Sequence, residues 1–219
     1  YCQNLLGNQR LSTEFLKAMY QESSPARASV VVIDMDGTLY PFDTPDNIYQ
    51  GSKLEKQVLE NAVSLAGSKS VIEDCLNNKI PLSKGVSEYL SISKSQYFEK
   101  VWGKIDPLQV VSDKSSAEVV KVLVANNKEL ILLSSSPLIW VNKVLEYLEI
   151  RQCFSQVFTA EDFRTKKDVF AKIAFKYRGK TVVSVGDQVT TDLIPAQQAG
   201  ISTYLISAPS DLQALILNI

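Results

Sequence analysis

Apolar residues follow two different patterns along the chain, and these patterns predict where strands and helices lie. Short runs of consecutive apolar residues, many of them β-branched, are typical of strands buried in a parallel sheet. Such runs occur in residues 29–33, 129–134 and 181–186, and two further strands are predicted at 202–207 and, more weakly, at 156–160. Apolar residues spaced three or four apart predict helices, which separate the later strands at residues 115–126, 137–148, 167–177 and 191–199.

The segment between the first and second predicted strands has a different pattern. Residues 52–104 show helical spacing with no good strand candidate, and predict three or four helices interrupted at Gly67, Pro81 and Ser93. A helical block in this position is an insertion into the alternating part of the chain rather than a tail.

The alternation of strands and helices predicts an α/β fold, a Rossmann-like doubly wound parallel sheet with a helical cap inserted after strand 1. We expect a core domain made of residues 29–43 and 106–219, with residues 44–105 as the cap. Residues 1–28 are predicted to be a partly helical leader that ends in a Ser/Pro turn.

Composition narrows the classes of protein. The 219 residues are 45% apolar and 21% charged, with a formal net charge of −1, which is ordinary for a globular protein. This charge gives no basis for a nucleic-acid or anionic-membrane surface, and no run approaches the roughly 18–20 apolar residues of a membrane-spanning helix. Cys2, Cys75 and Cys153 are scattered and odd in number, and no signal peptide is visible, so we expect a cytoplasmic protein.

The chain contains no histidine. This excludes Ser-His-Asp and Cys-His catalysis and every histidine-based metal site. An enzyme with this sequence must rely on carboxylates, hydroxyls and lysines.

Polar residues follow the predicted strands at their carboxyl ends, where open parallel sheets bind ligands. They are Asp34 and Asp36 after the first strand, Ser134, Ser135 and Ser136 after the second, Lys166 and Lys167 before the helix that follows the third, and Asp187 with Asp192 after the fourth. Each group alone has an ordinary explanation as a turn, a helix cap or a solvated surface. Their combination on one edge of the sheet indicates a functional site.

The chemistry of these residues suits a phosphate ester. Mg²⁺ prefers carboxylate oxygens together with water and phosphate, and Asp34 and Asp187 can supply that carboxylate pair. A carboxylate can also attack phosphorus, and a second one nearby can carry the proton of the leaving alcohol. Ser134 would hold phosphoryl oxygens, while Lys166 would offset the negative charge.

Three motifs resemble those of the haloacid dehalogenase-like hydrolases: "VVIDMDGTLY", "LILLSSSP" and "VSVGDQVTTDLIPAQQAG". The resemblance implies that Asp34 is the nucleophile and Asp36 the general acid/base. It also implies that Asp34, the Asp36 backbone carbonyl and Asp187 hold Mg²⁺. Because dehalogenases of this family lack the second aspartate of the first motif, Asp36 favours phosphoryl transfer.

The resemblance implies roles for other residues of the same motifs. Lys166 is favoured as the motif lysine, with Lys167 as the alternative. Ser134 matches the phosphate-binding serine, and Ser135 would share that role through its backbone N–H. Two supporting residues complete the set, Thr38 for the loop geometry and Asp192 for the metal's water or the lysine.

We therefore expect a Mg²⁺-dependent phosphatase that acts on a small phosphomonoester through an aspartyl-phosphate intermediate. The helical insertion corresponds to the family's C1 cap and is similar to the phosphoserine phosphatase and pyrimidine nucleotidase branches. The alternatives are a phosphomutase that acts on a sugar phosphate and a catalytically silent binding module. Tyr40, Phe42 and Asp43 are expected to contact substrate, while the substrate itself and the oligomeric state stay open.

Overall fold

The structure, a computed structural model, describes residues 28–42 and 52–216. Apart from Ala28, the predicted leader lies outside the described residues, as do Asp43 and Cys2.

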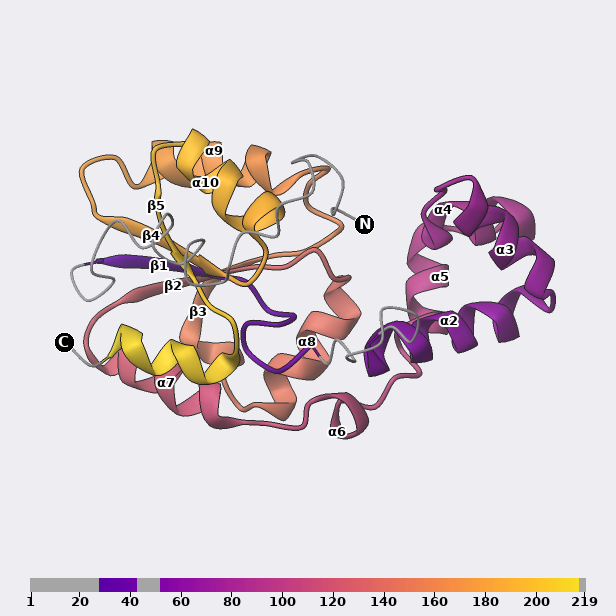
Figure 1. Cartoon of the computed structure of the whole chain (residues 1–219), viewed down its shortest axis with the longest axis horizontal. Helices are drawn as coiled ribbons and strands as arrows, with labels where there is room; N and C mark the ends of the chain where they lie inside the picture. Colours follow the sequence, from indigo (N-terminus) through magenta and orange to yellow (C-terminus); the bar gives the residue numbers. More distant parts are fainter. Residues whose placement is uncertain (1–27, 43–51, 217–219) are drawn as a thin grey trace, which may run out of the picture. The chain divides into compact units, whose positions relative to one another are not determined.

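Five parallel strands form one sheet, which confirms the predicted fold class (Figure 1). They are β1 (Val30–Ile33), β2 (Glu129–Leu133), β3 (Phe154–Phe158), β4 (Val182–Gly186) and β5 (Ser202–Leu205). Their order in the sheet is β3-β2-β1-β4-β5, and β1 pairs with both β2 and β4. The chain therefore reverses its direction of travel across the sheet at β1, which makes the carboxyl ends of β1 and β4 the expected ligand crevice.

Helices cover both faces of the sheet. The helices that follow β3 and β4 are α9 (Lys166–Lys176) and α10 (Ile194–Gln198), and they lie on one face. Their apolar side chains pack with those of β1, β2 and β4 in a buried cluster that includes Val32, Ile131 and Phe170. The other face carries α7 (Ser115–Ala125), which contacts the final 3-10 helix η4 (Pro209–Leu215).

Residues 52–104 are helical, as predicted. They contain α2 (Lys53–Ala66), α3 (Lys69–Asn77), α4 (Leu82–Leu90) and α5 (Lys94–Val101), and the short α6 (Pro107–Val110) and then α7 follow before β2. Serines begin two of them, because Ser52 and Ser93 each form a capping box with the residue three positions later. Gly67 ends α2 in the left-handed conformation, with φ +68°.

Contacts divide the chain into two compact units. Among the described residues, the α/β unit contains 28–41, 113–136 and 148–216, whereas the helical unit contains 42, 52–112 and 137–147. Helix α8 (Leu138–Tyr147) therefore groups with the helical segment, although we assigned its residues to the core domain from the sequence. The cap boundaries at 44 and 105 stay a prediction.

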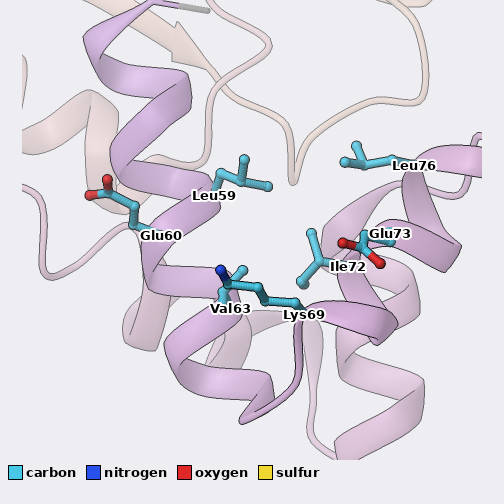
Figure 2. A pocket seen from close by; sticks show the side chains of 7 residues that line it. All are labelled: Leu59, Glu60, Val63, Lys69, Ile72, Glu73 and Leu76. Atoms are coloured by element: carbon cyan, nitrogen blue, oxygen red, sulfur yellow. The ribbon is translucent and has the colours of Figure 1, made fainter. Parts of the chain in front are cut away.

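The helical unit has an apolar core and an open groove. Its buried residues include Ile72, Val86, Tyr97 and Val101. The groove lies between α2 and α3 and has a volume of about 380 Å³. Figure 2 shows its lining, which consists of Leu59, Glu60, Val63, Lys69, Ile72, Glu73 and Leu76. None of these seven residues belongs to the motifs that the sequence singled out.

Two further observations concern the described residues. No helix among them combines the length and the apolar character needed to cross a membrane. Cys75 is buried and Cys153 is partly buried, and both are free thiols.

Candidate active site

The loop after β1 is a tight turn fixed by backbone hydrogen bonds. The Asp34 N–H donates to the Val185 carbonyl of β4 at 3.0 Å, which continues the pairing of the two strands. The chain then turns through Gly37 at φ +86°, a left-handed conformation that favours glycine. The N–H groups of Thr38 and Leu39 both donate to the Met35 carbonyl, at 3.2 and 2.8 Å. The turn thus keeps Asp34 and the residues that follow it at the carboxyl end of the sheet.

A side chain of α7 holds the end of this loop by a hydrogen bond to its backbone. The Ser116 hydroxyl, in the first turn of α7, donates to the Leu39 carbonyl at 2.5 Å. Leu39 and Thr38 are fully buried, and the Thr38 hydroxyl lies 3.4 Å from Asp34 Oδ2. Thr38 therefore lies in contact with Asp34, and its supporting role stays a prediction.

Lys166 joins two of the predicted acidic residues. Its Nζ donates to Asp34 Oδ1 at 2.5 Å and to Asp192 Oδ1 at 2.6 Å, and all three side chains are buried. The neighbouring Lys167 is exposed. Of the two lysines that the sequence left open, Lys166 is the one at the carboxylates, because the first turn of α9 directs it toward β1.

Burial and charge act against each other in this group. Burial raises the pKa of Asp34 well above its ordinary value, although the Lys166 ammonium opposes this shift. For Lys166, burial favours the neutral amine, but the Asp34 and Asp192 carboxylates outweigh it and raise the lysine pKa above its usual value. The lysine is consequently a fixed positive charge between two carboxylates.

Asp192 lies in a π-helical turn, η3 (Val189–Leu193), directly after β4. Its Oδ2 accepts a hydrogen bond from the Gln188 N–H at 3.1 Å, while Oδ1 is bound to Lys166. A Cβ at Gly186 would lie 2.6 Å from Asp192 Oδ2, closer than real Cβ atoms approach. The close packing of this turn on the end of β4 therefore requires glycine at position 186.

Asp187 completes the acidic group, and its surroundings fit a metal ion. One carboxylate oxygen from each of Asp34, Asp187 and Asp192 lies within 4.8 Å of the others. Asp187 Oδ1 is buried without a hydrogen-bond partner, which is costly unless another ligand compensates it. Burial, followed by the charge of Asp192, raises the Asp187 pKa to about 6. Gathered carboxylate oxygens with one unpaired oxygen are a donor set that suits a hard divalent cation such as Mg²⁺.

The loop leaves little space around Asp187. A Cβ at Gly37 would lie 2.4 Å from Asp187 Oδ2. Gly37 is therefore required twice, for its left-handed backbone and for the close approach of this carboxylate.

The Asp36 side chain lies among hydroxyl groups. The Tyr40 hydroxyl donates to Asp36 Oδ1, and Oδ2 accepts hydrogen bonds from Ser136 Oγ at 2.7 Å and Ser134 Oγ at 3.3 Å. Ser134 and Ser136 are buried, whereas Ser135 is exposed. The sequence predicts all three serines at this edge of the sheet but assigns no role to Ser136, whose hydroxyl makes the shorter contact with Asp36.

Ser136 and Tyr40 contact Asp36, a contact that the sequence does not predict for either residue. Ser136 follows Ser134 by two residues in the loop after β2, and both hydroxyls reach the same oxygen of Asp36, so the run of three serines is the signal that could have revealed it. Tyr40, which we expected to contact substrate, is instead fully buried with its hydroxyl on Asp36. No spacing rule predicts that contact, because it depends on the turn at Gly37. Phe42 is partly buried.

Comparison with known proteins identifies a family for this arrangement. Residues 28–200 match the family described as haloacid dehalogenase-like hydrolase, a range that includes every residue of the candidate site. No curated protein matches the chain in sequence.

Solved structures share the fold at low sequence identity. The candidate HAD hydrolase YfnB from Bacillus subtilis, solved bound to magnesium, is 16% identical with a TM-score of 0.60, over 88% of this chain and 100% of YfnB. A candidate phosphatase from Clostridium difficile is 21% identical with a TM-score of 0.53, over 85% and 92% of the two chains. The 2-haloacid dehalogenase from Pseudomonas syringae is 18% identical with a TM-score of 0.52, over 86% and 98%. These likenesses show the fold alone.

Proposed function

The chain belongs to the haloacid dehalogenase-like hydrolases, and we propose that within this family it is a Mg²⁺-dependent phosphatase of small phosphomonoesters. The observation that carries this proposal is the buried group in which Lys166 joins Asp34 and Asp192 beside the unpaired oxygen of Asp187. Such a group is costly to bury, and a phosphate ester with its metal ion is a ligand that compensates it.

Net charge supports a cation in the site. Asp34, Asp36, Asp187 and Asp192 bring four carboxylates together, and Lys166 offsets one of them. A phosphate dianion would be repelled by the remaining negative charge. Mg²⁺, held by Asp34, Asp187 and the Asp36 backbone carbonyl, would supply that missing positive charge and polarise the phosphoryl oxygens.

The residues of the chain divide the reaction between them. An Asp34 oxygen attacks phosphorus and forms the aspartyl phosphate, while the bond from phosphorus to the leaving oxygen breaks. Asp36 gives its proton to that oxygen, so the alcohol leaves neutral. Asp36 then takes a proton from water, which attacks phosphorus and restores the Asp34 carboxylate with release of phosphate.

Lys166 and Ser134 hold charge and orientation during both steps. The Lys166 ammonium stabilises the negative charge that develops on the phosphoryl group, and the Ser134 hydroxyl would donate to one of its oxygens. The Ser135 backbone N–H is proposed as a second donor. Asp192 keeps Lys166 in place through the bond of 2.6 Å.

The test is Mg²⁺-dependent hydrolysis of p-nitrophenyl phosphate, followed by a panel of nucleotides, sugar phosphates and phosphoamino acids. We expect phosphate release that stops with EDTA, and a fall on the order of 10⁴-fold in kcat for Asp34→Asn. Acid-quenched protein should retain labelled phosphate that hydroxylamine removes. Isomer formation without phosphate release would instead indicate a mutase, and an Asp34→Asn variant as active as the wild type would refute the mechanism.

A further inference from the structure

Three hydroxyl groups donate hydrogen bonds to the Asp36 carboxylate. The Tyr40 hydroxyl donates to one carboxylate oxygen, while the Ser136 and Ser134 hydroxyls donate to the other. Asp36 is also less buried than Asp34, the other carboxylate of its motif. Its orientation must therefore come from these hydrogen bonds more than from close packing.

The donors themselves are held in fixed positions. Tyr40 is fully buried, and its backbone carbonyl accepts the Gly37 N–H at 3.1 Å across the tight turn. Ser136 is buried, its N–H donates to Ser134 Oγ at 3.0 Å, and its carbonyl accepts the Ala160 N–H at 3.0 Å. Two hydroxyls from separate loops thus hold Asp36 from opposite oxygens.

We propose that Tyr40 and Ser136 are positioning residues that hold the Asp36 carboxyl in the orientation needed for proton transfer to the leaving oxygen. This inference rests on the function proposed above. A hydroxyl can donate or accept, so the same two contacts serve Asp36 with and without its proton. Proton transfer requires hydrogen-bond reach to the leaving oxygen, and a carboxyl free to rotate would spend less time in that geometry.

Ser134 differs from the other two hydroxyls. Its contact with Asp36 is the longer one, at 3.3 Å, and the proposed function assigns its hydroxyl to the phosphate. When phosphate binds, Ser134 can change partner while Tyr40 and Ser136 keep Asp36 in place. Ser134→Ala should therefore raise KM, whereas Tyr40→Phe and Ser136→Ala should lower kcat.

The chain offers a matched control for Tyr40. The Tyr177 hydroxyl also donates to a carboxylate, that of Glu129, and Tyr177 is buried. Glu129 begins β2, whereas Asp34 and Asp36 follow the end of the neighbouring parallel strand β1. Tyr177→Phe therefore removes the same atom from the same kind of bond at the opposite edge of the sheet.

The experiment compares two substrates of similar shape, phenyl phosphate and p-nitrophenyl phosphate. Phenolate is the poorer leaving group and needs the proton from Asp36 more than p-nitrophenolate does. For Tyr40→Phe and Ser136→Ala we expect kcat/KM, which reports the steps up to departure of the leaving group and not the later hydrolysis of the aspartyl phosphate, to fall roughly tenfold or more with phenyl phosphate, but less than about threefold with p-nitrophenyl phosphate. The ratio of the values for phenyl phosphate and p-nitrophenyl phosphate should change most in Asp36→Asn. Ser136→Thr, which keeps the hydroxyl, should have the wild-type ratio.

Each outcome decides between the alternatives. The proposal is supported if the ratio of the two substrates' kcat/KM values changes in Tyr40→Phe and Ser136→Ala but not in Tyr177→Phe. It also requires that Tyr40→Phe has no added effect in the Asp36→Asn background. Equal losses with both substrates, or no loss, overturn it, and melting curves identify a variant that has merely unfolded. If Tyr40→Phe does not fold, the Ser136→Ala and Ser136→Thr pair decides alone. Wild-type protein inactive on both esters refutes the proposed function, and this inference with it.

Discussion

The two units of the chain use their polar residues in opposite ways. The α/β unit buries charges, including Asp34, Lys166 and Asp192, and aims them at one edge of its sheet. The helical unit has an apolar core, and two of its serines, Ser52 and Ser93, cap helices. Burying a charge lowers stability unless a partner compensates it, so charges persist where chemistry requires them.

This contrast predicts different consequences of substitution in the two units. Changes at the edge of the sheet should alter activity and metal binding, with or without a loss of stability. Changes in the helical unit that remove caps or strain a turn should lower stability alone. Substitutions at the edge of the sheet should have larger effects than substitutions in the helical unit.

Lys166→Met should have the largest effect of these. The substitution leaves Asp34 and Asp192 buried without their counter-charge, which should lower the free energy of unfolding by about 3 kcal/mol. The loss of positive charge beside the phosphoryl group should lower kcat roughly 10³-fold. Thermal melting and p-nitrophenyl phosphate turnover measure both effects.

The matched control is Lys167→Met, which removes an exposed charge from the next position of α9. It should leave kcat and the melting temperature nearly unchanged. If Lys167→Met proves the more damaging of the two, the assignment of Lys166 to the site is wrong.

Two glycines with left-handed backbones, one in each unit, allow a sharper comparison. Gly37→Ala and Gly67→Ala should each lower the free energy of unfolding by about 1 kcal/mol, because both positions have positive φ. Only at Gly37 would the new Cβ meet Asp187, whereas nothing lies within 4 Å of a Cβ at Gly67. Gly37→Ala should therefore also weaken Mg²⁺ binding roughly tenfold or more.

The Mg²⁺-induced rise in melting temperature measures that difference. Equal Mg²⁺ affinities in the two alanine variants would show that the approach of Gly37 to Asp187 has no part in metal binding.

The pH dependence of Mg²⁺ binding should be moderate in size and definite in sign. The Asp187 pKa is raised to about 6 in the folded, metal-free protein, so protons bind Asp187 more tightly there than in the unfolded chain. This favours the metal-free fold at low pH, and the benefit is lost as pH rises through about 6. Mg²⁺ requires the carboxylate, so its affinity should fall about tenfold per pH unit below about pH 6.

Titrations of the melting temperature with Mg²⁺ at about pH 7, 6 and 5 test this expectation. Asp187→Asn should bind Mg²⁺ weakly at every pH, with a flatter dependence. Equal affinity of the wild type at the two extremes would exclude Asp187 as a titrating ligand.

The smallest effect is expected in the helical unit. Ser93→Ala removes the side chain that accepts from the Gln96 N–H at 3.1 Å, and should lower the free energy of unfolding by about 1 kcal/mol. Ser95→Ala, at an exposed position of the same helix, should cost little or nothing. Both variants should keep wild-type kcat. A loss of kcat in Ser93→Ala would contradict the expectation that cap substitutions in the helical unit lower stability alone.

Much of the fold was predictable because local patterns specify it. The buried runs predict β1 and β4, and the alternation of strands and helices predicts a parallel sheet. The three predicted breaks are helix caps in the structure, because these residues favour caps and turns. Gly67 ends α2, whereas Pro81 and Ser93 directly precede α4 and α5. Asp34 and Asp187, which the sequence suggests as a carboxylate pair, follow the neighbouring strands β1 and β4.

The candidate site was predictable by residue type and position along each strand, but not by contact. Position at the carboxyl end of a parallel strand brings Asp34, Asp187 and Asp192 to one edge, and a pattern in the sequence reveals that position. Whether α8 packs with the helical segment depends instead on contacts between residues distant in sequence.

The α/β class, the helical insertion and the set of acids and hydroxyls at the edge of the sheet follow from local properties of the sequence, namely strand and helix periods and turn residues. The folded chain is needed to distinguish Lys166 from Lys167, because successive positions of a helix point roughly 100° apart. It is also needed to find Ser136 and Tyr40 on Asp36, because the turn at Gly37 and the loop after β2 meet only once the sheet has formed.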